Sequence, residues 1–255
     1  MSDGHEPPTP GRAMTGRLYV GTSGFGYPAW APRFYPSGTR SGDLLPAYAA
    51  RLPAVELNGT FYRSPKPATV AGWLDATPER FRFVVKALRS GSMRAWATDP
   101  EGTLPWLLEP ARGFGSRLGA VLFRVGAEQR RDDDRLDRLL AAWPREVPLV
   151  LELQDPSWDD DEIHARLRAA GAVLCATDLP EAPEPPTLRL TGSILYARLR
   201  RDDYPFAELD AWAARFEPFL ASGRDVYVFF KHDAVGRGGE LALELSTRLA
   251  TFLPD

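Results

Sequence analysis

The sequence predicts a single (β/α)8 barrel, an α/β fold of eight parallel strands that alternate with helices. Short apolar runs alternate with helical stretches along the chain, which implies parallel strands. Eight such runs fall within 255 residues, close to the ~250 residues of a typical barrel of this kind. The rival fold, a doubly wound open sheet, normally carries a phosphate-binding loop after its first strand. The Gly-rich segment 21–26 matches neither G-x-G-x-x-G nor G-x-x-x-x-G-K-[ST].

Each predicted strand is a short run of β-branched, aromatic and other apolar residues. In order, the strands are Leu18–Thr22, Ala54–Leu57, Phe81–Lys86, Gly119–Val125, Leu149–Leu153, Ala172–Ala176, Ile194–Leu199 and Val226–Phe230. Between them, apolar residues at three- and four-residue spacing predict helices. These are Leu44–Arg51, Ala68–Ala76, Asp134–Trp143, Asp160–Ala170, Phe206–Ala221 and Glu240–Phe252.

Two connections are predicted to have weak or missing helices, those after the third and sixth strands. Gly102–Arg112 has helical spacing but contains Pro105 and Pro110. Proline removes a helix hydrogen bond and clashes with the preceding turn. Leu179–Pro186 is too rich in proline for a good helix.

Composition limits both the domain organisation and the partners. Residues 1–16 are polar and rich in Pro and Gly, so we expect a disordered tail followed by one barrel domain over 17–255. Lys plus Arg is 31 against 34 Asp plus Glu, a net charge of −3, which argues against nucleic-acid and anionic-membrane partners. A single cysteine excludes an internal disulfide. No apolar run suits a signal peptide or a membrane span, so a cytoplasmic location is expected. Nothing indicates the oligomeric state.

The predicted functional site lies where the strands end, since barrel enzymes work at the C-terminal face. Glu56 and Glu152 alternate with leucine and valine, which suit the helix-covered outer side, so both glutamates are expected to point into the barrel. Buried carboxylates need partners. Lys86, Arg124, Arg198 and Lys231 follow other strands and are available. A ligand site is one interpretation of this charge ring, and a structural plug of ion pairs is the other.

As an enzyme, the chain is expected to act on a small anionic or sugar-like molecule. Glu56 or Glu152 is the candidate general acid or base, and Lys86 the group that holds or polarises the substrate. Residues predicted to bind the substrate are Asn58, Tyr62, Arg124, Trp158, Asp178, Arg198 and Lys231. A glycosidase with two carboxylates is one version of this hypothesis. The alternative is a non-catalytic binding or scaffold protein.

No cofactor is indicated, and metals have little support. Of three histidines, only His232 lies at a strand end, which argues against a histidine-rich centre. A magnesium ion held by Glu56, Glu152 and Asp178 stays open. Four basic side chains against three acidic ones at the strand ends predict an anionic ligand.

Several motifs resemble those of the YecE-like family of uncharacterised TIM-barrel proteins. Residues 55–62, VELNGTFY, are similar to its V-E-x-N-x-T-F-Y signature, and Glu152-Leu153 with Pro156-Ser157-Trp158 is similar to its fifth-strand motif. Further likeness lies in Tyr19–Gly24, Trp73 with Thr77-Pro78, Phe81–Phe83 with Lys86, Tyr196–Arg198 and Val226–Lys231. The resemblance covers about residues 17–253. It implies a (β/α)8 barrel and no particular reaction.

The chain departs from the family pattern near the predicted site. Gln154 and Asp155 stand where the fifth-strand motif usually has Arg and His, and Arg124 stands where Gln is usual. The T-H-x-x-x-L stretch that usually follows Lys86 is absent. These changes predict a rearranged site, so a substrate shared with the wider family is not implied.

Overall fold

The computed structural model describes residues 15–255. Most of the predicted tail, residues 1–14, lies outside the described residues. Gly16, at the end of that predicted tail, is buried and its N–H donates to the carbonyl of Leu220 over 2.8 Å. Gly16 therefore packs against the barrel. The contact is so close that a Cβ atom at this position would lie 2.0 Å from the carbonyl oxygen of Arg224.

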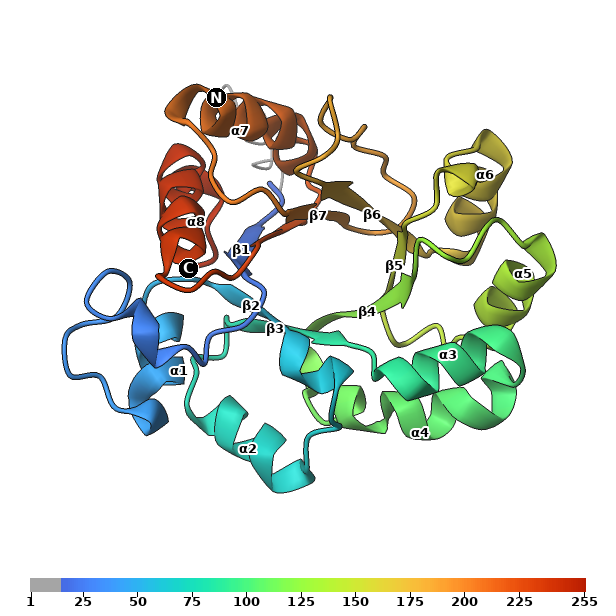
Figure 1. Cartoon of the computed structure of the whole chain (residues 1–255), viewed down its shortest axis with the longest axis horizontal. Coiled ribbons are helices and arrows are strands. Elements are labelled where there is room, and N and C mark those ends of the chain that lie inside the picture. Colours follow the sequence, from blue (N-terminus) through green and yellow to red (C-terminus); the bar gives the residue numbers. More distant parts are fainter. Residues whose placement is uncertain (1–14) are drawn as a thin grey trace, which may run out of the picture.

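Eight parallel strands form a nearly closed barrel, which confirms the predicted fold class. The strands are β1 (Leu18–Thr22), β2 (Ala54–Leu57), β3 (Arg82–Lys86), β4 (Leu118–Val125), β5 (Leu149–Leu153), β6 (Val173–Asp178), β7 (Leu195–Leu199) and β8 (Val226–Phe230). Their hydrogen-bonded order is β1-β8-β7-β6-β5-β4-β3-β2. Figure 1 shows the strands as a central ring with the helices outside it.

The helices cover the outer face of this ring. They are α1 (Leu44–Ala49), α2 (Pro67–Asp75), α3 (Arg89–Ala97), α4 (Pro100–Arg112), α5 (Asp133–Ala142), α6 (Asp161–Ala170), α7 (Phe206–Ala221) and α8 (Arg237–Arg248). Local sequence explains several ends. Asp132 and Asp160 cap the N-termini of α5 and α6 with their side chains, and Gly171 ends α6 in the left-handed conformation.

The connection after β3 is more helical than predicted: α4 covers the segment Gly102–Arg112 that was expected to be a weak helix, and α3 precedes it. Leu104, Leu107 and Leu108 of α4 are buried against the barrel. Pro105 is exposed and Pro110 only partly buried, so the carbonyls that lose a helix partner lie on the solvent side. Packing of the leucine face therefore outweighs the cost of the prolines. The segment from 179 to 194 between β6 and β7 has no helix, as predicted.

The barrel closes between β1 and β2, which lie side by side without a hydrogen-bonded ladder. A Cβ atom at Gly21 would lie 1.9 Å from the carbonyl oxygen of Ala54, so only glycine permits this approach. The hydroxyl of Tyr48 joins the two strands. It accepts the N–H of Thr22 at 2.7 Å and donates to the carbonyl of Ala54 at 3.0 Å.

Strand residues of one parity fill the barrel interior. The inner cluster includes Tyr19, Ala54, Val84, Leu122, Val150, Cys175, Tyr196 and Phe229. Two residues further along, on the same face, the side chains become polar at most strand ends. The apolar interior therefore ends in a polar layer at the C-terminal face.

Candidate functional site

The polar layer holds most of the predicted charge ring. Glu56, Lys86, Arg124, Glu152 and Arg198 each lie two residues beyond an inward apolar residue of their strand. Glu56, Lys86, Glu152 and Arg198 are buried. Glu56 and Glu152 therefore point into the barrel, as strand parity predicts, and not toward the helices.

Arg198 joins the two glutamates. Its Nη1 donates to Oε1 of Glu152 at 2.6 Å, and its Nη2 donates to Oε1 of Glu56 at 2.8 Å. All three side chains are almost completely buried. Burial opposes the charge on Arg198, but the two carboxylates outweigh it and raise its pKa well above the ordinary value. Arg198 is thus a fixed cation at the centre of the layer.

Further hydrogen bonds orient the carboxylates. The hydroxyl of Tyr196 donates to Oε2 of Glu56 at 2.7 Å, and the hydroxyl of Thr177 donates to Oε1 of Glu152 at 3.1 Å. Oε2 of Glu152 is buried without a hydrogen-bond partner among residues 15–255. Burial would raise the pKa of Glu152, but the charge of Arg198 and its hydrogen bond outweigh burial and lower it. Glu152 is therefore an ionised acceptor with one oxygen unused.

Lys86 lies beside this network with no carboxylate of its own. Its side chain is 8% exposed, and within residues 15–255 no ion pair within 4 Å is found for its ammonium. The ammonium lies 4.5 Å from the centre of the Phe61 ring. Burial, and then the charge of Arg198, lower the pKa of Lys86 to about 8, against the opposing effect of both glutamates. Lys86 can therefore exchange a proton near neutral pH.

Arg124 lies at the rim of the layer. Its side chain is 37% exposed, and its Nε is 4.0 Å from Oε2 of Glu152. Nε and Nη2 donate to Oε1 of Gln154 at 2.9 and 2.6 Å. Two of the three residues that depart from the family pattern, Arg124 and Gln154, thus contact each other.

A second polar group lies where β1, β7 and β8 end. Nη1 of Arg200 donates to the hydroxyl of Ser23 at 3.0 Å, and Nδ1 of His232 lies 3.3 Å from the same oxygen. The His232 ring stacks on Tyr27, with centroids 5.1 Å apart. Burial, and then the charge of Arg198, lower the pKa of Arg200. Burial, and then the charge of Arg200, lower the pKa of His232.

The structure does not bring every predicted residue to the layer. Tyr62 is 79% exposed. Trp158 is buried, and its indole N–H donates to the carbonyl of Gln129 at 2.8 Å. Asp178 accepts from the hydroxyl of Tyr204 at 2.7 Å and pairs with Arg201. Lys231 donates to Asp202 at 2.6 Å. Asn58 lies near the layer, and its Nδ2 donates to the carbonyl of Ser23 at 3.2 Å.

A magnesium ion held jointly by Glu56, Glu152 and Asp178 has no support, because Oδ2 of Asp178 is held by Tyr204 and Arg201 rather than directed to the two glutamates. Within residues 15–255, no group of three or more His, Cys, Asp or Glu side chains is arranged to hold a metal.

Sequence reasoning did not select Tyr196, Thr177 or Arg200 as site residues. Tyr196 lies on β7 and Arg200 directly follows this strand, and each is two residues away from Arg198, which places both on its face. Strand parity would therefore have found both. Parity also places Thr177 on the inner face, two residues after Cys175, but its contact with Glu152 depends on how two strands lie beside each other.

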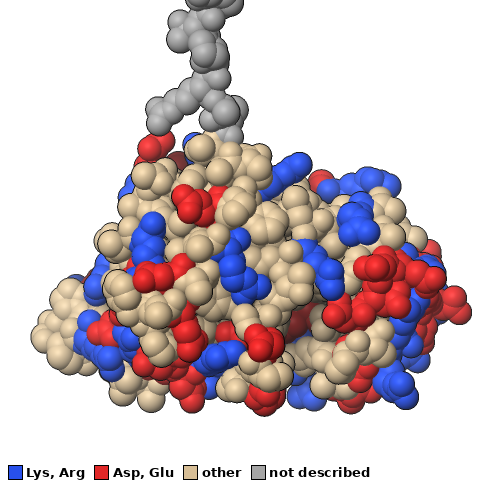
Figure 2. Space-filling model, turned by 90° about the horizontal axis from the view of Figure 1, so that it is seen from above, with Lys and Arg blue, Asp and Glu red and all other residues tan. Residues whose placement is uncertain are grey.

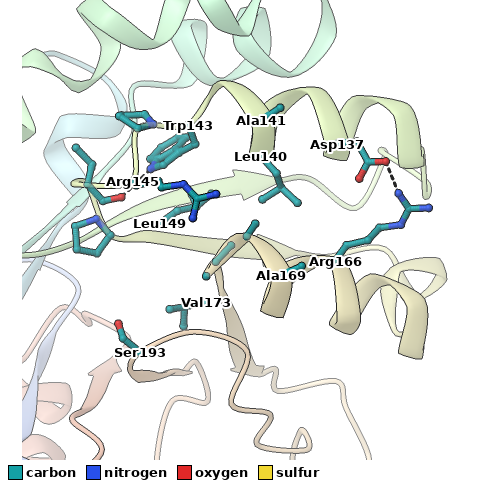
Figure 3. A pocket seen from close by; sticks show the side chains of 16 residues that line it. Asp137, Leu140, Ala141, Trp143, Arg145, Leu149, Arg166, Ala169, Val173 and Ser193 are labelled. Carbon is teal, nitrogen blue, oxygen red and sulfur yellow. Dashed lines mark hydrogen bonds and ion pairs between the residues drawn. The ribbon is translucent and has the colours of Figure 1, made fainter.

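Two cavities lie at opposite ends of the barrel. One, of about 450 Å³, lies between α5 and α6 and the starts of β5 and β6, with the Asp137–Arg166 pair at one side (Figure 3). It is at the N-terminal face, far from the charged layer. The other, of about 560 Å³, is lined by the loop after β1, by residues 57–60 and by α2, next to Asn58.

The outer surface gives no indication of a nucleic-acid partner on the face that Figure 2 draws, where basic and acidic side chains are interspersed. None of the helices in residues 15–255 combines the length and the apolar character needed to cross a membrane.

Comparison with known proteins assigns the chain to a family. It is 23% identical over 268 residues to the UPF0759 protein YunF of Bacillus subtilis (strain 168), a match that covers 89% of this chain and 94% of that protein. The crystal structure of a DUF72 family protein from Thermotoga maritima MSB8 matches with a TM-score of 0.82 and 25% identity, over 92% of this chain and 99% of the other.

A second DUF72 family protein, from Enterococcus faecalis V583, shares the fold, with a TM-score of 0.74 and 21% identity over 94% of this chain and 99% of the other. Residues 19–253, nearly the whole described barrel, match the family described as "Protein of unknown function DUF72". The resemblance to an uncharacterised family of barrel proteins is thereby confirmed at this level. The chain belongs to the DUF72 family.

Proposed function

We propose that the chain is an enzyme that acts on a small molecule with an anionic group, a carboxylate or phosphate, at the C-terminal face of the barrel. The observation that carries this proposal is that the ammonium of Lys86 is buried and has no carboxylate partner within 4 Å among residues 15–255. A buried ammonium without a carboxylate partner lowers stability. Such a cost is typical of functional sites, where a perturbed pKa serves chemistry. In a purely structural plug, we would expect Lys86 to be paired, as Arg198 is.

The arrangement favours proton transfer centred on Lys86. With a pKa of about 8, part of its amine is neutral at pH 7 and can accept a proton from a bound substrate. Oε2 of Glu152 is available to accept a hydrogen bond from a substrate hydroxyl. Arg124 and Arg200, at the rim, supply the cations for an anionic group. Each terminal nitrogen of Arg198 donates to one glutamate, so we assign Arg198 the role of positioning the glutamates.

The two-carboxylate glycosidase has less support. That chemistry needs one carboxyl group protonated at neutral pH, with a raised pKa. The pKa of Glu152 is lowered, so its environment does not favour the neutral acid that this chemistry needs.

A non-catalytic binding or scaffold protein is the second candidate. It is favoured by the completeness of the Glu56–Arg198–Glu152 network, which would stabilise the barrel mouth whether or not a ligand binds. The two candidates differ in what they predict for Lys86.

The test is mass spectrometry of small molecules that co-purify with the natural sequence, with Lys86→Met, and with Lys231→Met as the control. Lys231 follows β8, as Lys86 ends β3, but it pairs with Asp202. We expect an anionic molecule with the natural sequence and with Lys231→Met, and its loss with Lys86→Met. The natural sequence should then convert the purified compound.

Retention without conversion would favour the binding protein. The anionic proposal is wrong if phosphate, sulfate and carboxylates leave the melting temperature unchanged while neutral sugars raise it.

A further inference from the structure

The cavity of about 560 Å³ beside the charged layer has the size of a small-molecule site. Its walls come from the loop after β1, from the turn after β2, and from α2. It shares a wall with the layer, because the hydroxyl of Thr60 in its lining donates to the carbonyl of Lys86 at 2.7 Å. Asn58, two residues after Glu56, also lines it.

The interior of this cavity suits a flat apolar group. Phe25 and Trp73 meet edge to face, with centroids 6.4 Å apart and planes at 90°. Trp73 also stacks on Phe114, with centroids 6.2 Å apart, and this contact helps to fix the orientation of the indole. Leu57 adds a further apolar surface. Rigid aromatic walls of this kind favour a planar ring over a flexible chain.

The charged side chains that line this cavity are all positive. Arg63 and Lys66 are its charged side chains, and both are exposed at the rim. Across residues 15–255, neither is found in an ion pair, whereas many of the other arginines are paired. Two free cations over an apolar slot complement a ring that carries an anionic substituent.

A polar atom in the lining also lacks a partner. Oδ1 of Asn58 is buried and accepts no hydrogen bond from any described residue, although Nδ2 of the same amide is held by the carbonyl of Ser23. A buried acceptor left unpaired is costly. A ligand N–H or O–H would satisfy it.

We infer that this cavity binds an aromatic or heteroaromatic ring that carries a carboxylate or phosphate, with the anion at Arg63 and Lys66. That the ring belongs to the substrate of the adjacent Lys86 centre rests on the proposed function. The existence of the binding site does not.

Isothermal titration calorimetry of the full chain with 2-naphthoate tests the inference. We compare the natural sequence with Arg63→Gln/Lys66→Gln and with the control Arg80→Gln/Arg224→Gln. The control makes the same charge change at two exposed arginines that precede β3 and β8, at the other end of the barrel. Naphthalene-2-methanol serves as the neutral ligand, and cyclohexanecarboxylate as the non-aromatic anion.

We expect 2-naphthoate to bind at least tenfold more tightly than either comparison ligand. Its Kd should rise at least tenfold in Arg63→Gln/Lys66→Gln and stay within twofold in the control. Absence of binding, or equal weakening in both double variants, would overturn the inference.

Lys86→Met separates this inference from the proposed function. If it abolishes binding of 2-naphthoate while Arg63→Gln/Lys66→Gln does not, the anion lies in the charged layer and the inference is wrong, although the proposed function gains support. If the cavity behaves as expected but Lys86→Met keeps the co-purifying molecule, the proposed function fails and the binding site stands.

Discussion

Nη2 of Arg198 lies 2.8 Å from Oε1 of Glu56, although the two residues are 142 positions apart in the chain. Both are buried, and the same guanidinium binds Glu152 at 2.6 Å. A buried charge is tolerated when it is paired and hydrogen-bonded. One arginine on β7 therefore makes it possible for strands β2 and β5 to end in inward glutamates.

Arg198→Met should destabilise the fold strongly, because it leaves two buried carboxylates without their shared cation. Breaking a buried ion pair from one side typically costs about 3–5 kcal/mol. Urea unfolding at pH 7 measures the change. The triple variant Glu56→Gln/Glu152→Gln/Arg198→Met removes all three charges and should recover part of the loss. A triple variant no more stable than Arg198→Met would contradict the electrostatic cause.

Lys86→Met should raise stability at pH 7. The lowered pKa of Lys86 means that its charged form is disfavoured in the folded state. Methionine keeps much of the apolar stem and removes the charge, so the free energy of unfolding should increase by on the order of 1–3 kcal/mol. Thermal and urea unfolding test this. A clear loss of stability would show that Lys86 is a structural member of the ion network, as the scaffold alternative requires.

The same lysine should make stability depend on pH in the alkaline range. Its folded-state pKa of about 8 lies below its ordinary 10.5, so the unfolded chain binds more protons between these values. Stability contributed by this group therefore rises with pH across that window. The difference in unfolding free energy between Lys86→Met and the natural sequence should shrink from pH 7 to pH 10. A constant difference would contradict the lowered pKa.

Strand parity and the alternation of elements were enough to predict the barrel and the inward direction of Glu56 and Glu152. Both depend on local spacing, which the sequence displays directly. The helix with Pro105 and Pro110 was predicted only as a weak one, because its stability comes from leucines packed on the barrel rather than from propensity. Tertiary contacts commonly override local preference in this way.

The partners of individual site residues were less predictable. Charge alone does not distinguish Lys231, which pairs with Asp202 outside the layer, from Lys86, which has no such partner. The cavity lined by Arg63 and Trp73 was also not predicted, because it arises where the loops after β1 and β2 pack against α2. Loop positions in space are set by packing, which a single sequence does not show.

Tyr48→Phe should destabilise the seam between β1 and β2. Its hydroxyl replaces ladder hydrogen bonds there, so its loss leaves the buried N–H of Thr22 without that acceptor. An unsatisfied buried group costs about 1–3 kcal/mol. Denaturant unfolding and hydrogen exchange at Thr22 measure the effect, with Tyr62→Phe, an exposed tyrosine, as the control. Equal stability of the two variants would mean that water replaces the hydroxyl at this seam.

Sulfate binding should strengthen as pH falls from 7 to 5, and His232 should be responsible. Its pKa is lowered from 6.5 by burial and by Arg200, partly offset by Asp233 and Glu56, so the ring is neutral at pH 7. An anion beside Arg200 would favour protonation of His232, so binding and proton uptake reinforce each other. Without an anion, the effect of protonation on stability is the opposite. The lowered pKa of His232 means that the unfolded chain binds this proton more readily, so the stability contributed by His232 falls as pH drops below 6.5.

Sulfate keeps its charge from pH 7 to pH 5, so any change in its affinity over this range reports a titration of the protein. Calorimetry at several pH values should show a tightening Kd for the natural sequence and for His164→Gln, whose ring lies in α6. His232→Gln should give a flat profile, and an unchanged slope in that variant would assign the proton to another group.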